Sequence, residues 1–280
     1  MGLLPELGRL LAALGVNVDI TGFLVVFGLM FARLITVISM APFLGGKSTP
    51  GNIKVGLAVI LAMVLYPSVA AGHAPEVPQS VAAVALVAKE VLIGAALGLA
   101  SQLVFYGIQM AGAIIDLQRG MSQMEFVAPQ LQGNTSVLGL FQFQASLVVF
   151  LAIGGHLIFI RALSESFVTL PIATFPHLPA GGLAVAELFG RISADMFILA
   201  MGLCAPVLIV LILVDAVFGA IARAAQQVRA NQESQPVKAM VGLGVLFLSA
   251  GFLMDRMIPA LQSIIRQIHD VVGSLGGALG

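Results

Sequence analysis

Charged side chains are scarce in this chain. Asp, Glu, Lys and Arg together make up 9% of its 280 residues, whereas hydrophobic residues make up 59%. A soluble globular domain carries about 25% charged residues, because water has to wet its surface. So few charges cannot cover a soluble globule of this length, and the composition therefore indicates a protein of the lipid bilayer.

Runs of basic residues are missing, and cysteine nearly so. Thirteen basic and thirteen acidic side chains give a formal net charge of zero, so we expect no nucleic-acid partner. The single cysteine, Cys204, lies in an apolar stretch. It has no partner for an internal disulfide, and we interpret it as a small core residue.

Signatures of catalysis are missing as well. The sequence contains no H-E-x-x-H, no G-x-S-x-G, no Walker loop and no dinucleotide fingerprint, so we do not expect an enzyme. The four histidines are scattered, and their spacing suggests no metal cluster. We expect no metal and no cofactor. An intramembrane enzyme of unfamiliar geometry is the alternative.

Long apolar stretches are what the chain does have. About 20 apolar residues are needed for a helix to cross about 30 Å of hydrocarbon. Nothing alternates with the period of two that a barrel requires, and an open sheet cannot survive in lipid. We therefore predict an all-α, polytopic helical membrane protein with about six hydrophobic segments, forming one domain over residues 1–280. The stretches are Ile20 to Gly46, Val55 to Pro75, Val91 to Ile115, Phe126 to Ile160 (apolar from Val137), Met196 to Val214, and Ala239 to Met254.

Polar connections separate these segments, and both ends of the chain are amphipathic. The longer connections are predicted at residues 116–136, 161–195 and 215–238. Leucine or isoleucine recurs at helical spacing over about 1–19 and 255–272, so each end could lie along a membrane surface or a neighbouring helix. The first 19 residues lack a basic start and a continuous apolar run, and we expect no cleaved signal peptide.

A few charges lie within or beside the apolar segments. Arg33 falls inside the first stretch, Glu90 begins the third and Asp215 ends the fifth. Such charges are costly in lipid and usually face protein or water. One reading makes them polar groups of a pore or an interface. The other pairs Glu90 with Lys89 at a helix end, while Arg33 snorkels or pairs internally.

Glycines at helical spacing indicate close helix contacts. Gly94 and Gly98 form a Gly-x-x-x-Gly pair on one helix face, which lets another helix approach closely. We predict the same packing role for Gly112.

The connection after the third stretch is too long for a tight turn. Its methionines and phenylalanine are soft or bulky enough to fill an irregular space. Non-helical backbone at membrane depth is tolerated only where protein or a water-filled cavity surrounds it. A re-entrant loop that closes a channel and an exposed surface loop both fit. The residues concerned are Asp116, Gln118, Arg119, Gly120, Met121, Met124, Phe126 and Pro129.

The order of several short motifs resembles one family. The motifs are Arg33, Ala41-Pro-Phe-Leu-Gly45, Glu90 to Gly98, Ala111 to Gly120, Pro129, Gly154-Gly-His156 and Pro236-Val-Lys238. By their order, from about Phe31 to Gly242, the chain resembles FliR of the flagellar type III export gate and its injectisome counterpart SctT. The sequence departs where the family has P-Q-L-N-x-F: residues 226–231 read QQVRAN, and Gln227 alone matches. From the residues, we expect 226–235 to be a solvated connection, with a partner-contact surface as the alternative.

The resemblance implies a fold, a function and partners. It implies a subunit that forms, with FliP-like and FliQ-like proteins, a channel for unfolded export substrates in the bacterial inner membrane. An FlhB-like protein would dock beside this gate and an FlhA-like protein below it, at the base of a flagellum or an injectisome. Residues 116–129 would be its plug, and Arg33, Glu90, His156, Asp215, Gln227 and Lys238 would be structural or partner-contacting polar groups. We favour the flagellar branch; the alternatives are an injectisome subunit and a self-contained small-molecule transporter.

Overall fold

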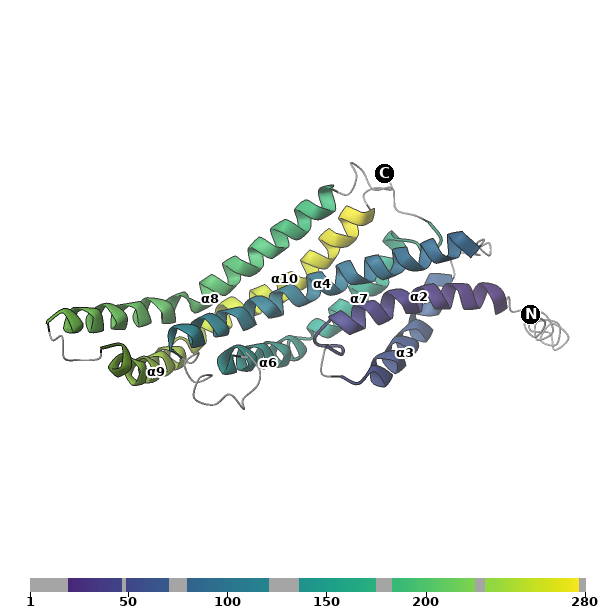
Figure 1. Ribbon diagram of the computed structural model, residues 1–280. Helices are drawn as coiled ribbons and strands as arrows, with labels where there is room; N and C mark the ends of the chain where they lie inside the picture. The colour runs from purple at the N-terminus through teal and green to yellow at the C-terminus, as the bar shows by residue number, and fades with distance from the viewer. Residues whose placement is uncertain are drawn as a thin grey trace. The chain divides into compact units, whose positions relative to one another are not determined.

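The computed structural model describes residues 20–46, 49–70, 80–120, 136–174, 183–224 and 230–276, and no strand occurs in these ranges. Figure 1 shows the helices in chain order from purple to yellow. They are α2 (Ile20–Met40), α3 (Gly51–Ala70), α4 (Ser80–Gln118), α6 (Val137–Ala152), α7 (Gly155–Thr169), α8 (Leu183–Ala224), α9 (Ala230–Leu248) and α10 (Ala250–Gly276).

Four helices are long and apolar enough to cross a membrane. Their apolar parts are Thr21–Met40, Gly51–Val69, Ala82–Gln118 and Val185–Ala224. Two bent pairs, α6 with α7 and α9 with α10, raise the number to six if each pair is one span. The prediction of an all-helical polytopic membrane protein is therefore confirmed.

Two predicted segments are much longer helices than expected. Helix α4 has 39 residues and α8 has 42, so the connections predicted to begin at residue 116 and to extend to residue 195 have the wrong limits. The connection between α7 and α8 is limited to residues 170–182. Charges end an apolar stretch, but Glu, Arg, Lys and Gln are good helix formers and do not end a helix.

Two other predicted segments are broken. Helix α6 meets α7 at a bend of 74°, where Gly154 has a φ of +74°. A side chain is strained at that φ, whereas glycine is not. The stretch predicted as one segment from residue 239 to 254 bends by 62° between α9 and α10. There the Ser249 hydroxyl donates to the Leu246 carbonyl at 3.3 Å, a type of bond that bends helices.

The polar stretch before α9 is only partly a connection. Residues 230–235 form the beginning of α9, and Ser234 is buried there. The prediction of a connection is therefore wrong for these six residues, and the prediction that they are solvated is wrong for Ser234, whereas Glu233 is exposed. Residues 225–229 lie outside the described part of the chain.

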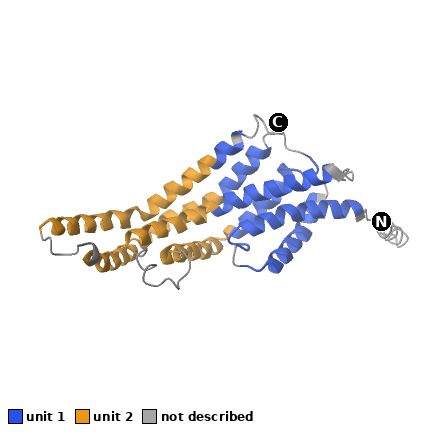
Figure 2. Cartoon of the chain, in the orientation of Figure 1, with its two compact units in different colours: residues 1–102, 156–189, 265–280 blue, residues 103–155, 190–264 orange. Residues whose placement is uncertain are grey.

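The chain forms two compact units, coloured in Figure 2. Unit 1 comprises residues 1–102, 156–189 and 265–280, and unit 2 comprises residues 103–155 and 190–264. A single domain over the whole chain stays a prediction.

Unit 1 is built on α2, which packs against α3. The turn between these helices contains Pro42, and the residue before a proline disfavours helical backbone, so α2 ends at Met40. The rings of Phe23 and Tyr66 meet edge to face, with centroids 4.9 Å apart. Leu34, Val37 and Ile38 are fully buried.

Unit 2 has an aromatic core between α4 and α6. The Phe105 ring lies 5.5 Å from that of Phe150 and 6.3 Å from that of Phe143, both edge to face. Cys204 on α8 is buried and forms no disulfide among the described residues. The prediction that Cys204 is a small core residue is confirmed.

Helix α10 carries the predicted amphipathic stripe but begins earlier than expected, at Ala250. Its Leu261, Ile268 and Val272 are buried. In unit 1 its end packs against α7, because a Cβ on Gly276 would lie 2.7 Å from Cγ2 of Thr169. This part of α10 therefore lies along a neighbouring helix. The predicted amphipathic segment at residues 1–19 lies outside the described residues.

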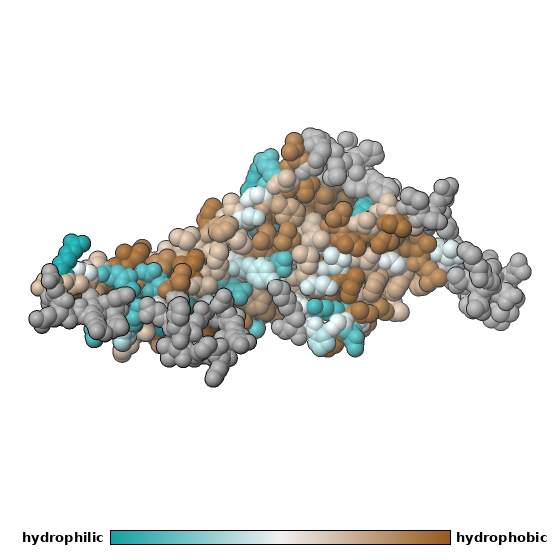
Figure 3. All heavy atoms as spheres, viewed as in Figure 1, coloured by the Kyte–Doolittle hydropathy of each residue, from teal (hydrophilic) through white to brown (hydrophobic). Residues whose placement is uncertain are grey.

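Large apolar side chains cover much of the surface, as the brown atoms in Figure 3 show. On α9, Met240 is 78% exposed and Phe247 is 82% exposed. Surfaces of this kind mark contacts with lipid or with other proteins.

Candidate functional site

Arg33 is at the centre of a buried polar network in unit 1. Its guanidinium donates through Nε to Glu90 Oε2 at 2.5 Å, and neither side chain is exposed. Nη1 donates to the carbonyl and hydroxyl oxygens of Ser166 at 3.0 and 3.2 Å, and Nη2 donates to the Leu170 carbonyl at 2.9 Å. The guanidinium also stacks on Phe167, with Cζ 4.2 Å from the ring centroid. Arg33 therefore joins α2, α4 and α7.

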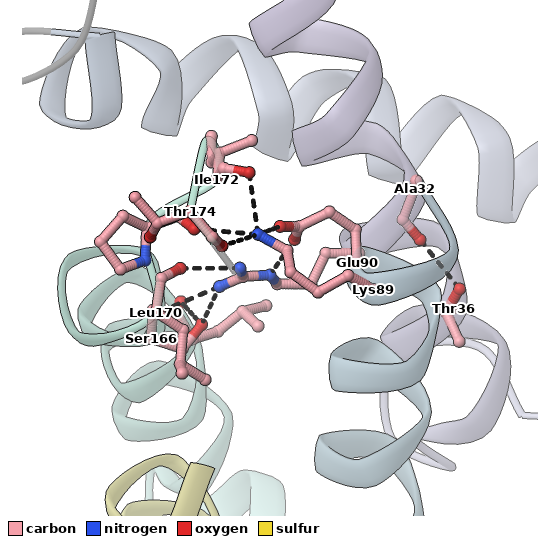
Figure 4. A network of polar contacts seen from close by, with 11 residues as sticks. Ala32, Thr36, Lys89, Glu90, Ser166, Leu170, Ile172 and Thr174 are labelled. Carbon is pink, nitrogen blue, oxygen red and sulfur yellow. Dashed lines mark hydrogen bonds and ion pairs between the residues drawn. The ribbon is translucent and has the colours of Figure 1, made fainter. Parts of the chain in front are cut away.

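Lys89 extends this network beyond the end of α7. Its ammonium donates to three carbonyl oxygens, of Pro171, Ile172 and Thr174, at 2.8–2.9 Å. It also pairs with Glu90 Oε1 at 2.7 Å. Figure 4 shows Lys89 and Glu90 on one helix, with Ile172 and Thr174 on the facing chain segment. A single side chain thus fixes the course of residues 171–174.

The network contains two cations and one carboxylate. The extra positive charge is compensated by carbonyl oxygens at and beyond the carboxyl end of α7, where the helix dipole is negative. Arg and Lys lie on different helices but share Glu90, each using one of its oxygens. Of the two readings from sequence, internal pairing is the one that the structure shows. Glu90 lies inside α4, however, and not at a helix end.

The predicted glycine pair lies next to this network. A Cβ on Gly94 would be 2.6 Å from the Arg33 carbonyl oxygen, and one on Gly98 would be 2.7 Å from Met40 Cβ. Helix α4 therefore approaches α2 closely along this face, as the Gly-x-x-x-Gly pattern predicts. The role of this contact in assembly stays a prediction.

Asp116 carries a second network, in unit 2, that joins the end of α4 to the beginning of α6. Its Oδ2 accepts from the Ser136 hydroxyl at 2.6 Å and from the Leu138 backbone N–H at 2.9 Å. The Ser136 hydroxyl in turn accepts from the Gly139 N–H at 2.7 Å. Ser136 is thus the N-cap of α6, and the Asp116 carboxylate lies at the positive end of that helix.

Asp215 and Lys238 join the same end of α4 to α8 and α9. Gln118 donates to Asp215 Oδ2 at 2.9 Å, and Lys238 pairs with Asp215 Oδ1. Arg119 lies 3.5 Å from Asp116 Oδ1 and donates to the Ala239 carbonyl at 3.1 Å. Five predicted polar residues therefore come together within unit 2, although they belong to distant parts of the sequence: Asp116, Gln118, Arg119, Asp215 and Lys238.

Close backbone contacts accompany these bonds. A Cβ on Gly112 would lie 2.6 Å from both N and Cα of Gly139, so α4 and α6 touch there. Gly120 has a φ of +79°, and Gln235 occupies the space that a side chain at this position would need. Only glycine suits Gly120 on both grounds.

Some predicted residues do not join either network. The Nδ1 atom of His156 is buried, with no hydrogen-bond partner in the described part of the chain. Met121, Met124, Phe126, Pro129 and Gln227 lie outside the described residues, and their predicted roles stay predictions.

The sequence analysis did not predict the roles of several residues in the two networks. Ser166 contributes to the Arg33 network mainly through its backbone carbonyl, for which the sequence gives no signal. Ser136 stands directly before an apolar helical run, and that position indicates an N-cap. No group of three or more His, Cys, Asp or Glu side chains within the described ranges could hold a metal ion.

Residues 24–264 match the family described as bacterial export proteins, family 1. The chain belongs to this family. Among its relatives is the flagellar biosynthetic protein FliR of Escherichia coli K12, 30% identical over 243 residues, which are 87% of this chain and 89% of the relative. FliR of Pectobacterium carotovorum is 29% identical over 245 residues, 88% and 90% of the two chains. The Yop proteins translocation protein T of Yersinia pestis is 26% identical over 250 residues, 89% and 95% of the two chains.

The match to this export-protein family agrees with the resemblance seen in the sequence. It begins just before Arg33 and includes both polar networks. The networks thus belong to the part of the chain that is shared with bacterial export proteins.

Proposed function

We propose that this chain is a subunit of the export gate of a flagellar type III protein secretion system. The observation that carries the proposal is its similarity to flagellar FliR proteins over nearly the full length of both chains. In this role the protein is a structural part of a channel for unfolded proteins, and the proposal includes no catalytic step.

The proposed partners are FliP-like and FliQ-like subunits, which would complete the channel. The exposed apolar side chains of α8 and α9 support this, because a helix surface so rich in apolar groups needs lipid or protein against it. The proposal places the assembly in the bacterial inner membrane, at the base of a flagellum. An FlhB-like protein would dock beside it and an FlhA-like one below.

We also propose that residues 116–129 close the gate at rest. The beginning of this stretch is well held: Asp116 binds the first turn of α6, and Arg119 binds α9. Methionine side chains, as at 121 and 124, are unbranched and repack readily around passing groups. Deleting residues 121–126 is expected to raise ion conductance across membranes that contain the assembled gate, and to slow growth without any export substrate.

A matched control for the deletion keeps the apolar volume. The double variant Met121→Leu, Met124→Leu should leave the resting conductance at the level of the unchanged gate. If the deletion also leaves the conductance unchanged, the plug assignment is wrong, and another subunit must form the seal.

The function itself is tested by deleting the gene in its own host. Loss of motility and of flagellar protein export, restored by a plasmid copy, is the expected result. The assembled protein should purify from native membranes with FliP-like and FliQ-like chains. A motile deletion strain, or a free monomer that transports a small molecule, would contradict the proposal.

An injectisome subunit is the second candidate, since the Yersinia translocation protein is also similar over most of its length. The deletion strain separates the two, because loss of effector secretion with normal motility would assign the chain to an injectisome.

A further inference from the structure

Helix α7 and the end of α10 share a charged surface in unit 1. Arg161 Nε lies 3.2 Å from Glu165 Oε1, one turn along α7. His269 Nε2, on α10, lies 3.2 Å from the other oxygen of the same carboxylate. Glu165 therefore bridges the two helices. We call this row, together with Arg266 and Asp270 beside it on α10, the charged face.

The side chains of the charged face are exposed, whereas those at the centre of the Arg33 and Asp116 networks are buried. The side chains of Arg161, His269 and Glu165 are 82%, 54% and 49% exposed. Arg266 and Asp270 are exposed as well. The opposite sides of both helices are buried, at Leu163 and Phe167 on α7 and at Ile268 and Val271 on α10. Both helices thus have one side against protein and one free side, and the free sides carry these charges.

Lipid does not fit the charged residues of this free side. Both helices are halves of bent pairs that are long and apolar enough to be membrane spans. Ionisable groups in such segments are costly against hydrocarbon and face protein or a water-filled path. Here Arg161 and Glu165 are more than half and about half exposed, so this chain does not cover them. On α3 and α8 the exposed side chains are largely apolar and suit lipid, whereas on α7 the exposed Leu157, Ile158 and Val168 lie along the helix from the charged residues.

The charges on this face are balanced. Arg161 and Arg266 contribute two positive charges, and Glu165 and Asp270 contribute two negative ones, so the sum is zero with His269 neutral. Exposed ion pairs contribute only about 0–1 kcal/mol each, and they rearrange easily. A surface with equal positive and negative charge is hydrated, but it binds neither acidic nor basic segments of a polypeptide strongly.

We propose that the charged face lines the water-filled path of the exported polypeptide. The proposal rests on the proposed export function. Its occupant is an unfolded polypeptide in transit, which brings side chains of both signs past Arg161, Glu165 and His269. The local balance of charge keeps the wall wet without selecting cargo by its charge.

Single cysteines test this proposal in membranes that contain the complete gate. Cys204, which is buried, is first replaced by alanine, and Arg161→Cys and Arg266→Cys are then introduced singly. Both cysteines are expected to react with membrane-impermeant methanethiosulfonates, with positive and negative reagents within about threefold of each other. Ile209→Cys and Ile212→Cys, on an exposed apolar side of α8, are the matched controls and should react at least tenfold more slowly.

The second arm uses an export substrate fused to a domain that does not unfold, so that the fusion stalls in the gate. The stalled chain is expected to slow labelling at positions 161 and 266 at least fivefold. Failure of the fusion to purify with the gate would count against the export function itself. A fusion that is held while labelling is unchanged would overturn the charged face as a lining. Labelling as slow as that of the α8 controls, without any substrate, would also overturn it, because the face would then be covered by lipid or another subunit.

Discussion

The guanidinium of Arg33 meets the carboxylate of Glu90 at 2.5 Å, and neither group has any exposed surface. The pair joins α2 to α4 inside a protein of the membrane. Because Lys89 uses the second oxygen of the same carboxylate, Glu90 is the one negative charge that two buried cations share. We therefore expect the removal of Glu90 to destabilise the protein more than the removal of either cation.

Glu90→Gln should be strongly destabilising. Removing one partner of a buried ion pair costs about 3–5 kcal/mol, because the remaining charge is left uncompensated. The measurement is the thermal unfolding of the detergent-purified gate. Arg161→Gln is the matched control, since its ion pair is exposed and is worth about 0–1 kcal/mol. Equal stability of the two variants would contradict the shared role of Glu90.

Lys89→Met should free the chain segment after α7. The ammonium is bound to three carbonyl oxygens of residues 171–174, and methionine keeps the length of the side chain but donates nothing. Hydrogen exchange of the backbone amides in this segment should rise at least tenfold, while exchange in α2 changes little. Arg266→Met, on the exposed side of α10, is the control and should leave the segment protected.

Gly112→Ala should separate α4 from α6. The added methyl group would lie 2.6 Å from the Gly139 backbone, and backbone atoms cannot move aside as a flexible side chain does. We expect lower thermal stability and loss of the assembled gate. Gly202→Ala is the control: no atom lies within 4 Å of its added methyl group, and alanine favours an exposed helix interior by about 0.5–1 kcal/mol. Assembly of Gly112→Ala at the normal level would refute the contact.

Asp116→Ala and Ser136→Ala should each loosen the first turn of α6. Each removes an acceptor from a backbone N–H of that turn, and loss of an N-cap costs about 0.5–2 kcal/mol. Because Ser136 both donates to Asp116 and caps Gly139, the effects should be smaller together than their sum. A double-mutant cycle on thermal unfolding measures this. Strict additivity would show that the two side chains act separately.

Expression without partners should give little stable protein. The side chains of Met240, Phe247 and Leu248 on α9 are more than three-quarters exposed, and partner binding stabilises the folded state by mass action. Co-expression with FliP-like and FliQ-like proteins is expected to raise both the yield and the unfolding temperature. Equal monodispersity and stability alone would contradict the prediction.

The sequence predicted the class of fold better than the limits of its helices. Apolar content alone indicated helical spans, because lipid leaves few alternatives. Helix ends were harder to place: Asp116 and Asp195 are charged, yet α4 and α8 continue through them. A polar residue ends an apolar run, whereas a helix ends only where the backbone leaves the helical conformation.

For the candidate site, individual residues could be predicted from the sequence, but most of their contacts could not. Arg33 and Glu90 could be singled out, because charges are conspicuous in an apolar chain. Their pairing could not be predicted, since 57 residues separate them and the carbonyl groups that accept from Arg33 belong to α7 and to the residue that follows it. The close helix contact at Gly94 could be predicted from the glycine spacing alone, because that spacing places both glycines on one helix face whichever helix packs against it.

Two aspartates on α8 are separated by about the thickness of the hydrocarbon layer. Asp215 follows Asp195 by 20 residues, which is about 30 Å at the rise of an α-helix, and no charge lies between them. This equals the thickness of the hydrocarbon layer, about 30 Å. If the two carboxylates lie at opposite interfaces, the pair of Asp215 with Lys238 lies at headgroup level. The last turns of α8, with Arg223, then extend out of the bilayer, and a membrane thinner than this distance would force α8 to tilt.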